Sequence, residues 1–85
     1  MTNEEFLDES ISVVAAMNES GEVNPQRVTW QSRKYRITAV GRQWDEAGGR
    51  HVLVEAGDGT RFELQLRRED FTWRIKRVWR AIEAA

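Results

Sequence analysis

Basic side chains are the residues of this sequence with the clearest chemistry, because lysine and arginine neutralise the phosphates of nucleic acid. Residues 73–80, WRIKRVWR, interleave two tryptophans with four cations, and such a pattern can join base stacking to phosphate contacts. The competing interpretation is an ordinary solvated surface, which the modest net charge of +5 after residue 22 favours. The candidate contacts for a nucleic acid or a protein partner are Arg33, Lys34, Arg67, Arg68, Arg74, Lys76 and Arg80.

The other reactive residue types form no recognisable catalytic or metal-binding pattern. His51 is the only histidine, and its position at the start of an expected strand indicates a strand-end residue rather than a base or a ligand. Asp45 and Glu46 precede glycines in a polar loop, which indicates a solvated turn. No serine or threonine has the surroundings of an activated nucleophile. The sequence therefore predicts a domain that is not an enzyme and has no metal and no cofactor.

Composition limits the expected cellular setting. The chain has no cysteine and so no disulfide framework, which favours a reducing, cytoplasmic compartment. The first residues, MTNEEFLDES, lack the basic and apolar regions of a signal peptide. No apolar run is long enough to span a bilayer. We expect a soluble, untargeted domain that does not contact a membrane.

Charge is divided unevenly along the chain. Residues 1–22 hold six acidic residues and no basic one, whereas the remainder holds all 13 basic residues against eight acidic ones. Such a division can mark an acidic tail, a basic binding face, or two parts of one domain that neutralise each other.

The acidic segment, residues 1–22, has the pattern of an amphipathic helix. Thr2 and Glu5 match a capping box, and Gly21 is placed to end the helix. This helix either completes the core or shields the basic surface. Its apolar stripe, at spacings of three and four residues, consists of Phe6, Leu7, Ile11, Val14 and Met17.

After Pro25 the pattern changes to the alternation of strands. Gly41 is expected to form a bulge that returns Val40 and Trp44 to the core side. Short connections indicate an antiparallel meander, and most aromatic rings are expected in its core. The expected strands are residues 27–30, 35–44, 51–56, 60–66 and about 73–80.

The predicted fold class is therefore α+β. An N-terminal amphipathic helix precedes a five-stranded antiparallel meander that curls into a small, partly open β-barrel. We treat residues 1–85 as a single domain, with the acidic helix in residues 1–22 and the curled sheet in residues 26–80.

The closing segment, residues 73–80, allows two interpretations. As a strand it places Trp73, Ile75, Arg77 and Trp79 on one face and the remaining residues on the other. As a helix continuing into residues 81–85 it forms one apolar stripe. We prefer the strand for its β-branched and aromatic content, with the helix from Arg77 onward as the alternative. In both geometries the tryptophans turn mostly away from the cations, which indicates that they belong to the core.

Several of these residues also carry a resemblance to a known family. From residue 25 to residue 80 the chain resembles a family of small bacterial domains of unknown function. Similar domains occur at the C-terminal end of proteins that resemble Y-family, translesion-type DNA polymerases. The resemblance implies a place in DNA damage tolerance and defines no catalytic residue. Its residues are Trp30, Tyr35, Trp44, Asp58, Gly59, Phe62, Trp73, Ile75, Arg77, Val78 and Trp79.

Three functions follow as hypotheses. The first is a non-catalytic interaction module that docks a protein partner, accessory to bacterial DNA repair or translesion synthesis. The second is weak, sequence-tolerant binding of single-stranded nucleic acid by the basic face. The third is self-association through the edges of an incompletely closed sheet, so that the domain is a monomer or a homodimer.

Overall fold

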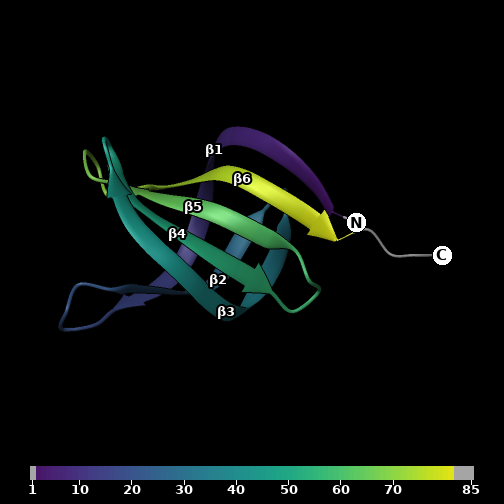
Figure 1. Cartoon of the computed structure of the whole chain (residues 1–85), viewed down its shortest axis with the longest axis horizontal. Coiled ribbons are helices and arrows are strands. Elements are labelled where there is room, and N and C mark those ends of the chain that lie inside the picture. The colour runs from purple at the N-terminus through teal and green to yellow at the C-terminus, as the bar shows by residue number, and fades with distance from the viewer. Residues whose placement is uncertain (1, 82–85) are drawn as a thin grey trace.

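The computed structural model describes residues 2–81 and shows a closed, six-stranded antiparallel β-barrel (Figure 1). Each strand is hydrogen-bonded to the next, and β6 returns to pair with β1. Residues 2–81 contain no helix long and apolar enough to cross a membrane. The strands are β1 (Thr2–Met17), β2 (Val23–Trp30), β3 (Arg33–Glu46), β4 (Gly49–Ala56), β5 (Arg61–Arg67) and β6 (Trp73–Ala81).

The predicted N-terminal helix is wrong, because the acidic segment forms strand β1. The first part of β1 pairs with β6, from Thr2↔Ala81 to Ile11↔Trp73, and the last part pairs with β2, from Ser12↔Thr29 onward. Five strands alone would leave β2 and β6 with unpaired edges, and β1 fills both. The α+β class is thus corrected to all-β, and the partly open barrel to a closed one.

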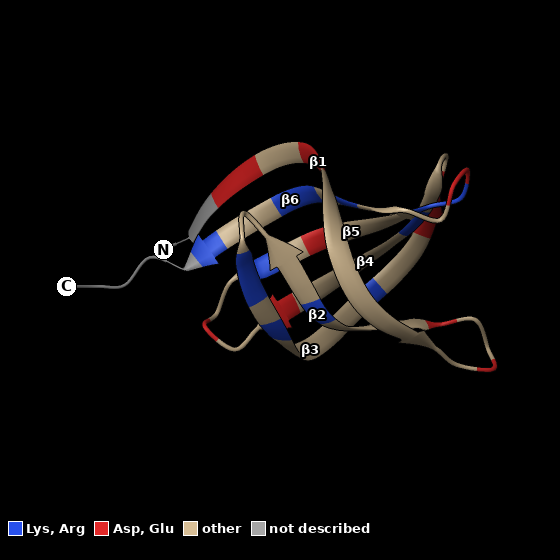
Figure 2. Cartoon of the chain, turned by 180° about the vertical axis from the view of Figure 1, so that it is seen from behind, with Lys and Arg blue, Asp and Glu red and all other residues tan. Residues whose placement is uncertain are grey.

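Charge accompanies this pairing. Acidic positions of β1 lie beside basic positions of β6 (Figure 2), and their side chains form ion pairs that include Glu5 with Arg80 and Asp8 with Arg74. The uneven charge of the sequence therefore belongs to two neighbouring strands of one barrel. The argument for self-association through open sheet edges no longer applies, because these edges are paired within the barrel.

The core fills the barrel with inward side chains from the strands. Trp30, Tyr35 and Phe62 pack edge-to-face or tilted, with ring centroids 5.1 to 6.4 Å apart. Leu7, Ile11 and Val13 of β1 are half-buried against this cluster. The expectation that most aromatic rings lie in the core holds for these three, whereas Phe6 and Phe71 are exposed and three tryptophans are half-buried.

Irregularities in β3 and β6 break the strict alternation expected from the sequence. Register shifts occur in β3 between Ile37 and Ala39 and between Val40 and Gln43. They do not return Trp44 to the core as expected, because Trp44 lies opposite His51 on the outer face, and Val40 stays 37% exposed. Where β2 and β3 separate, the amide of Gln43 bonds both the N–H and the C=O of Val23, at 3.1 and 2.7 Å.

The closing segment is a strand through Ala81, as preferred, and residues 82–85 of the helical alternative lie outside the described part. A register shift opposite Glu63 and Leu64 leaves Lys76 without a partner on β5. Lys76 and Arg77 therefore both face outward, and Val78 instead of Arg77 enters the core with Ile75. Trp73 packs against the core, as expected for both tryptophans of this segment. Trp79 instead pairs with Arg61 on the outer face, with Arg77 4.8 Å from its ring, so the expected separation from the cations is wrong for Trp79.

Candidate functional site

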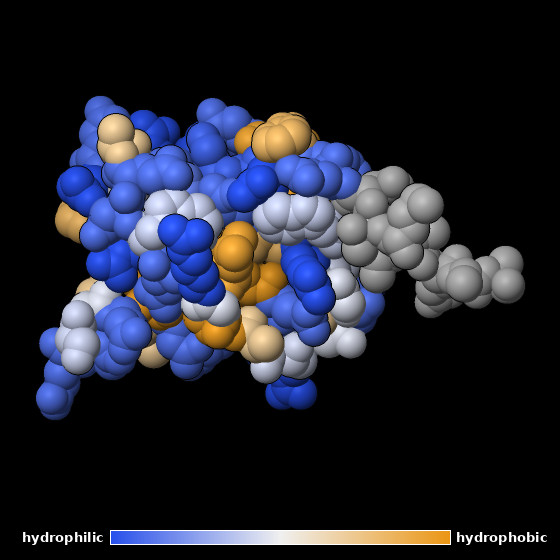
Figure 3. Space-filling model, viewed as in Figure 1, coloured by the Kyte–Doolittle hydropathy of each residue, from blue (hydrophilic) through white to orange (hydrophobic). Residues whose placement is uncertain are grey.

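An apolar groove lies on the outer face of β3, β4, β5 and β6. Its volume is about 370 Å³, and its lining includes Ala39, Leu53 and Trp79, with the ion pair Arg61–Glu55 (2.9 Å) at its border. Figure 3 shows an apolar area in the middle of this face, surrounded by hydrophilic surface. Water contacts this apolar area in the isolated domain. Covering the groove with another apolar group would therefore lower the free energy.

Gly41 keeps the groove open. A Cβ atom at this position would lie 3.8 Å from Leu53 Cβ and 3.5 Å from its carbonyl oxygen, which are ordinary contact distances. The backbone of Gly41 is also outside the left-handed region that favours glycine. A Cβ atom would therefore fit here in contact with Leu53, so the absence of a side chain at Gly41 leaves the space over Leu53 open.

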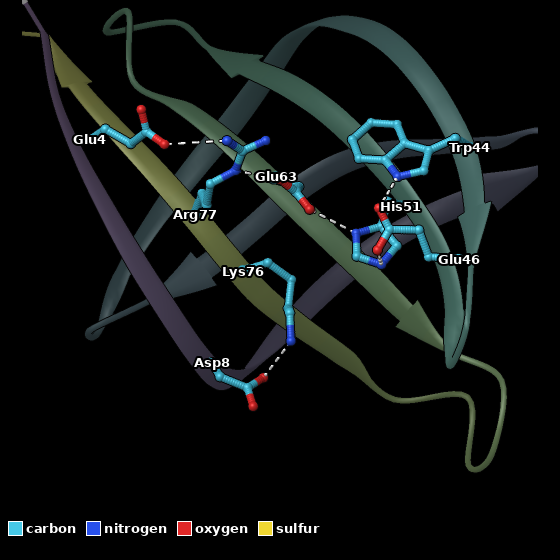
Figure 4. A network of polar contacts seen from close by, with 8 residues as sticks. All are labelled: Glu4, Asp8, Trp44, Glu46, His51, Glu63, Lys76 and Arg77. Atoms are coloured by element: carbon cyan, nitrogen blue, oxygen red, sulfur yellow. Dashed lines mark hydrogen bonds and ion pairs between the residues drawn. The ribbon is translucent and has the colours of Figure 1, made fainter.

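A buried carboxylate lies next to the groove on the same face. Glu63 of β5 is 6% exposed, and its two oxygens contact different partners: Arg77 Nε donates to one at 2.6 Å, and His51 Nδ1 lies 2.7 Å from the other. Arg77 also donates to Glu4 of β1 at 3.2 Å. The hydrogen bond to Glu63 is the main reason that the pKa of Arg77 is raised. The network, shown in Figure 4, runs from Glu4 of β1 through Arg77 of β6 and Glu63 of β5 to His51 of β4. It compensates a buried charge that would be costly without partners.

His51 is enclosed rather than presented to a substrate. It is 3% exposed, and the Trp44 ring stacks on it with centroids 5.3 Å apart. Trp44 Nε1 donates to Glu46 at 2.7 Å, and the other oxygen of Glu46 lies 3.7 Å from His51 Nε2. Both ring nitrogens thus face carboxylates, and no exposed edge remains for a reacting group. The expectation of a simple strand-end residue missed this enclosure.

The predicted basic contacts are mostly neutralised by neighbours. Lys34 forms no ion pair with the described residues, and each of the other six does. Ion pairs of this kind lower the net positive charge that a phosphate would meet. The pairs are Arg33 with Asp58, Arg67 with Glu69 and Asp70, Arg68 with Asp45, Arg74 and Lys76 with Asp8, and Arg80 with Glu5.

The seven residues also do not form one patch. Arg67, Arg68, Arg74 and Lys76 line a hollow of about 620 Å³, together with carboxylates that include Asp8. The hydrogen bond from Arg74, followed by that from Lys76, lowers the pKa of Asp8 below its usual value. The remaining three residues lie away from this hollow. Arg33 and Lys34 adjoin the β2–β3 turn, and Arg80 lies over the Trp30 ring at 4.8 Å.

The comparison with family models identifies the family of this chain. Residues 1–83 match the model described as "Domain of unknown function (DUF6504)". The chain belongs to this family. No curated protein and no solved structure matches it. The DUF6504 match confirms the resemblance to domains of unknown function and extends it to the N-terminal segment, whereas nothing in the comparisons links the chain to Y-family polymerases.

The sequence of this DUF6504 domain gave little indication of the buried polar network on the outer face. Glu63 alternates with Phe62 and Leu64 and so looks like a solvent-facing residue of β5. Its partners are Arg77, which a bulge turns outward, and His51 of β4, on which the Trp44 ring stacks. Among residues 2–81, no cluster of three His, Cys, Asp or Glu side chains could hold a metal ion.

Proposed function

We propose that this domain is a non-catalytic binding module whose groove receives an apolar side chain of a protein partner. The observation that carries the proposal is the opening over Leu53, which exists because Gly41 has no side chain. Any other residue at position 41 would place its side chain over the apolar floor of the groove. Glycine leaves that role to another molecule.

The surroundings of the groove favour a protein segment as the occupant. Trp79 and Arg61 border the opening, and tryptophan and arginine are the residue types that most often dominate binding energy at protein interfaces. Arg61 is bound by Glu55, so this border is nearly neutral. Arg42, next to Gly41, lies 5.2 Å from the Trp44 ring and forms no ion pair with the described residues. We therefore assign the groove a segment with an apolar anchor followed or preceded by a carboxylate.

The cellular process and the compartment of this binding are also part of the proposal. The resemblance to domains at the end of Y-family polymerase-like proteins supports an accessory role in bacterial DNA repair or translesion synthesis. The lack of cysteine supports a cytoplasmic setting. A partner from such an assembly is therefore the first natural candidate once a binding motif is known.

Selection from a random peptide library displayed on phage tests the groove without a known partner. The bait is the whole domain, and the blocked variant is Gly41→Val, which fills the space over Leu53. The matched control is Gly57→Val, at an exposed glycine of the β4–β5 turn where a Cβ would lie 3.6 Å from Thr38 Cγ2. Both variants add the same side chain at a backbone that accepts it.

The proposal expects enriched peptides that share an apolar anchor beside an aspartate or glutamate. Such a peptide, resynthesised, should bind Gly41→Val at least about tenfold more weakly than the wild type and should bind Gly57→Val equally well. Thermal unfolding confirms that both variants are folded. Equal binding to the blocked variant, or no enrichment over an unrelated bait, contradicts the proposal.

A further inference from the structure

Among residues 2–81, basic side chains without carboxylate partners gather on the surface of β2 and β3, apart from the apolar groove. Every lysine and arginine of the sequence lies among residues 2–81, and all form ion pairs there except Arg27, Lys34, Arg36 and Arg42. Three of these four occupy β2 and the start of β3, where Figure 2 shows basic positions side by side and no acidic position on β2.

The strand register places these three cations on one face. Arg27 lies directly opposite Arg36, and Thr29 lies opposite Lys34. Because side chains two residues apart in a strand share a face, Arg27, Lys34 and Arg36 all point to the same side. All three are exposed. We call this set the β2–β3 cation cluster.

The pair Arg27–Arg36 lowers the stability of the isolated domain. Like charges directly opposite across an antiparallel pair repel each other, whereas the other arginines of residues 2–81, apart from Arg42, each have a carboxylate partner. Two carboxylates of β4 and of the β4–β5 turn already have other partners, Glu55 with Arg61 and Asp58 with Arg33. An anionic ligand would remove this repulsion.

We propose that the β2–β3 cation cluster binds the phosphate backbone of single-stranded nucleic acid. The cluster is about 5 Å wide, the distance between neighbouring strands, and about 7 Å long, the span of two residues along a strand. These dimensions suit successive phosphates of one strand. Thr29 and Ser12, opposite each other on the same face, add hydroxyl donors.

A duplex and a lipid surface fit this cluster less well. The turn between β2 and β3 consists of Gln31 and Ser32 alone, and β1 flanks β2, so the pair cannot enter the groove of a duplex as a free ribbon. Next to the cluster, Val14 of β1 lies opposite Arg27 and is the nearest exposed apolar side chain among the described residues. A lipid interface calls for a broader apolar face.

This site uses other residues than the groove, so it does not depend on the proposed protein-binding function. The probe is a fluorescent oligothymidylate of about 16 nucleotides, titrated with the whole domain by anisotropy. Three phosphate contacts on a single strand predict a log-log salt slope near −2 and a loss of affinity of about 20-fold between about 50 and 200 mM salt.

The decisive variant replaces the cluster: Arg27→Thr, Lys34→Thr and Arg36→Thr. Its control replaces three exposed, carboxylate-bound arginines, Arg33→Thr, Arg68→Thr and Arg80→Thr. Each triple variant replaces three basic residues with threonine, so both lose three positive charges. We expect the first to bind at least about tenfold more weakly, the control to change by less than about threefold, and the first to melt no lower than the wild type because the repulsion is gone.

Four results would overturn the inference. They are equal losses in both triple variants, binding that does not fall with salt, equal or tighter binding of a duplex of the same length, and binding of vesicles rich in anionic lipid without binding of the oligonucleotide.

Discussion

Glu63 is the residue on which the outer face depends most, because it holds His51 and Arg77 at 2.7 and 2.6 Å while almost fully buried. Glu63→Gln removes a buried charge from between its two partners and should lower the free energy of unfolding by about 3 kcal/mol or more. Glu55→Gln, which breaks the exposed pair with Arg61, should cost less than about 1 kcal/mol. Urea unfolding of the two variants measures the difference. Equal costs would mean that the Glu63 network does not stabilise the barrel.

Asp8 ties β1 to β6 and makes the domain sensitive to acid. Its pKa in the folded chain is lowered by the hydrogen bonds from Arg74 and Lys76. A lowered carboxyl pKa stabilises the folded state above the usual value of 3.8, and this contribution is lost as the pH falls through the folded value. Asp8→Asn should therefore be less stable than the wild type at pH 7, and the gap should close in strong acid. A gap that is the same at both pH values contradicts this assignment.

The β2–β3 hairpin turn stores strain that its sequence does not relieve. Gln31 and Ser32 have φ angles of 53° and 63°, the left-handed region in which ordinary side chains are disfavoured. Replacing them with Asn-Gly, the usual residues of such a turn, should raise the free energy of unfolding by about 1 kcal/mol or more. Thermal unfolding tests this. No gain, or a loss, would show that the turn is not in this conformation.

Strand β1 shows where sequence reasoning reached its limit. Leu7 and Ile11 are four residues apart, a spacing that suits one helix face and equally one strand face. Val14 and Met17, which complete the helical stripe, are 52% and 61% exposed in the barrel. Pairing with both β2 and β6 decides the element, and no local pattern contains that information. The five later strands were predictable because short turns separate them and most of their residues alternate, although bulges interrupt the alternation in β3 and β6.

Val13 and Val14 separate the strand from the helix experimentally. The strand places Val13 against the core and Val14 in solvent, whereas the predicted helical stripe contains Val14. Val13→Thr should cost about 1–2 kcal/mol, because the hydroxyl enters an apolar site, and Val14→Thr should change stability by less than about 0.5 kcal/mol. Chemical denaturation of both variants provides the measurement, and the reverse order would support the helix.

Across the whole molecule, within residues 2–81, most charged side chains are paired with each other and a few basic ones are not. Acidic β1 neutralises basic β6, and the Glu63 network uses a further carboxylate inside the outer face. What remains is an open apolar groove over Leu53 and the β2–β3 cation cluster. The sequence indicated that basic residues matter, but of the seven that it singled out only Lys34 belongs to this cluster, and the other six are paired with carboxylates. Arg27 and Arg36 were missed because only the strand register shows that they face each other.

If the barrel has two separate ligand surfaces, each ligand should perturb its own set of backbone amides. Backbone amide spectra of the labelled domain are recorded during titration with a groove-selected peptide and, separately, with the oligothymidylate. The peptide should shift signals around Gly41, Leu53 and Trp79, and the oligonucleotide should shift signals around Arg27 and Arg36. The presence of two surfaces is contradicted if both ligands shift the same signals, or if the oligonucleotide acts on the hollow at Arg67, Arg68, Arg74 and Lys76 instead.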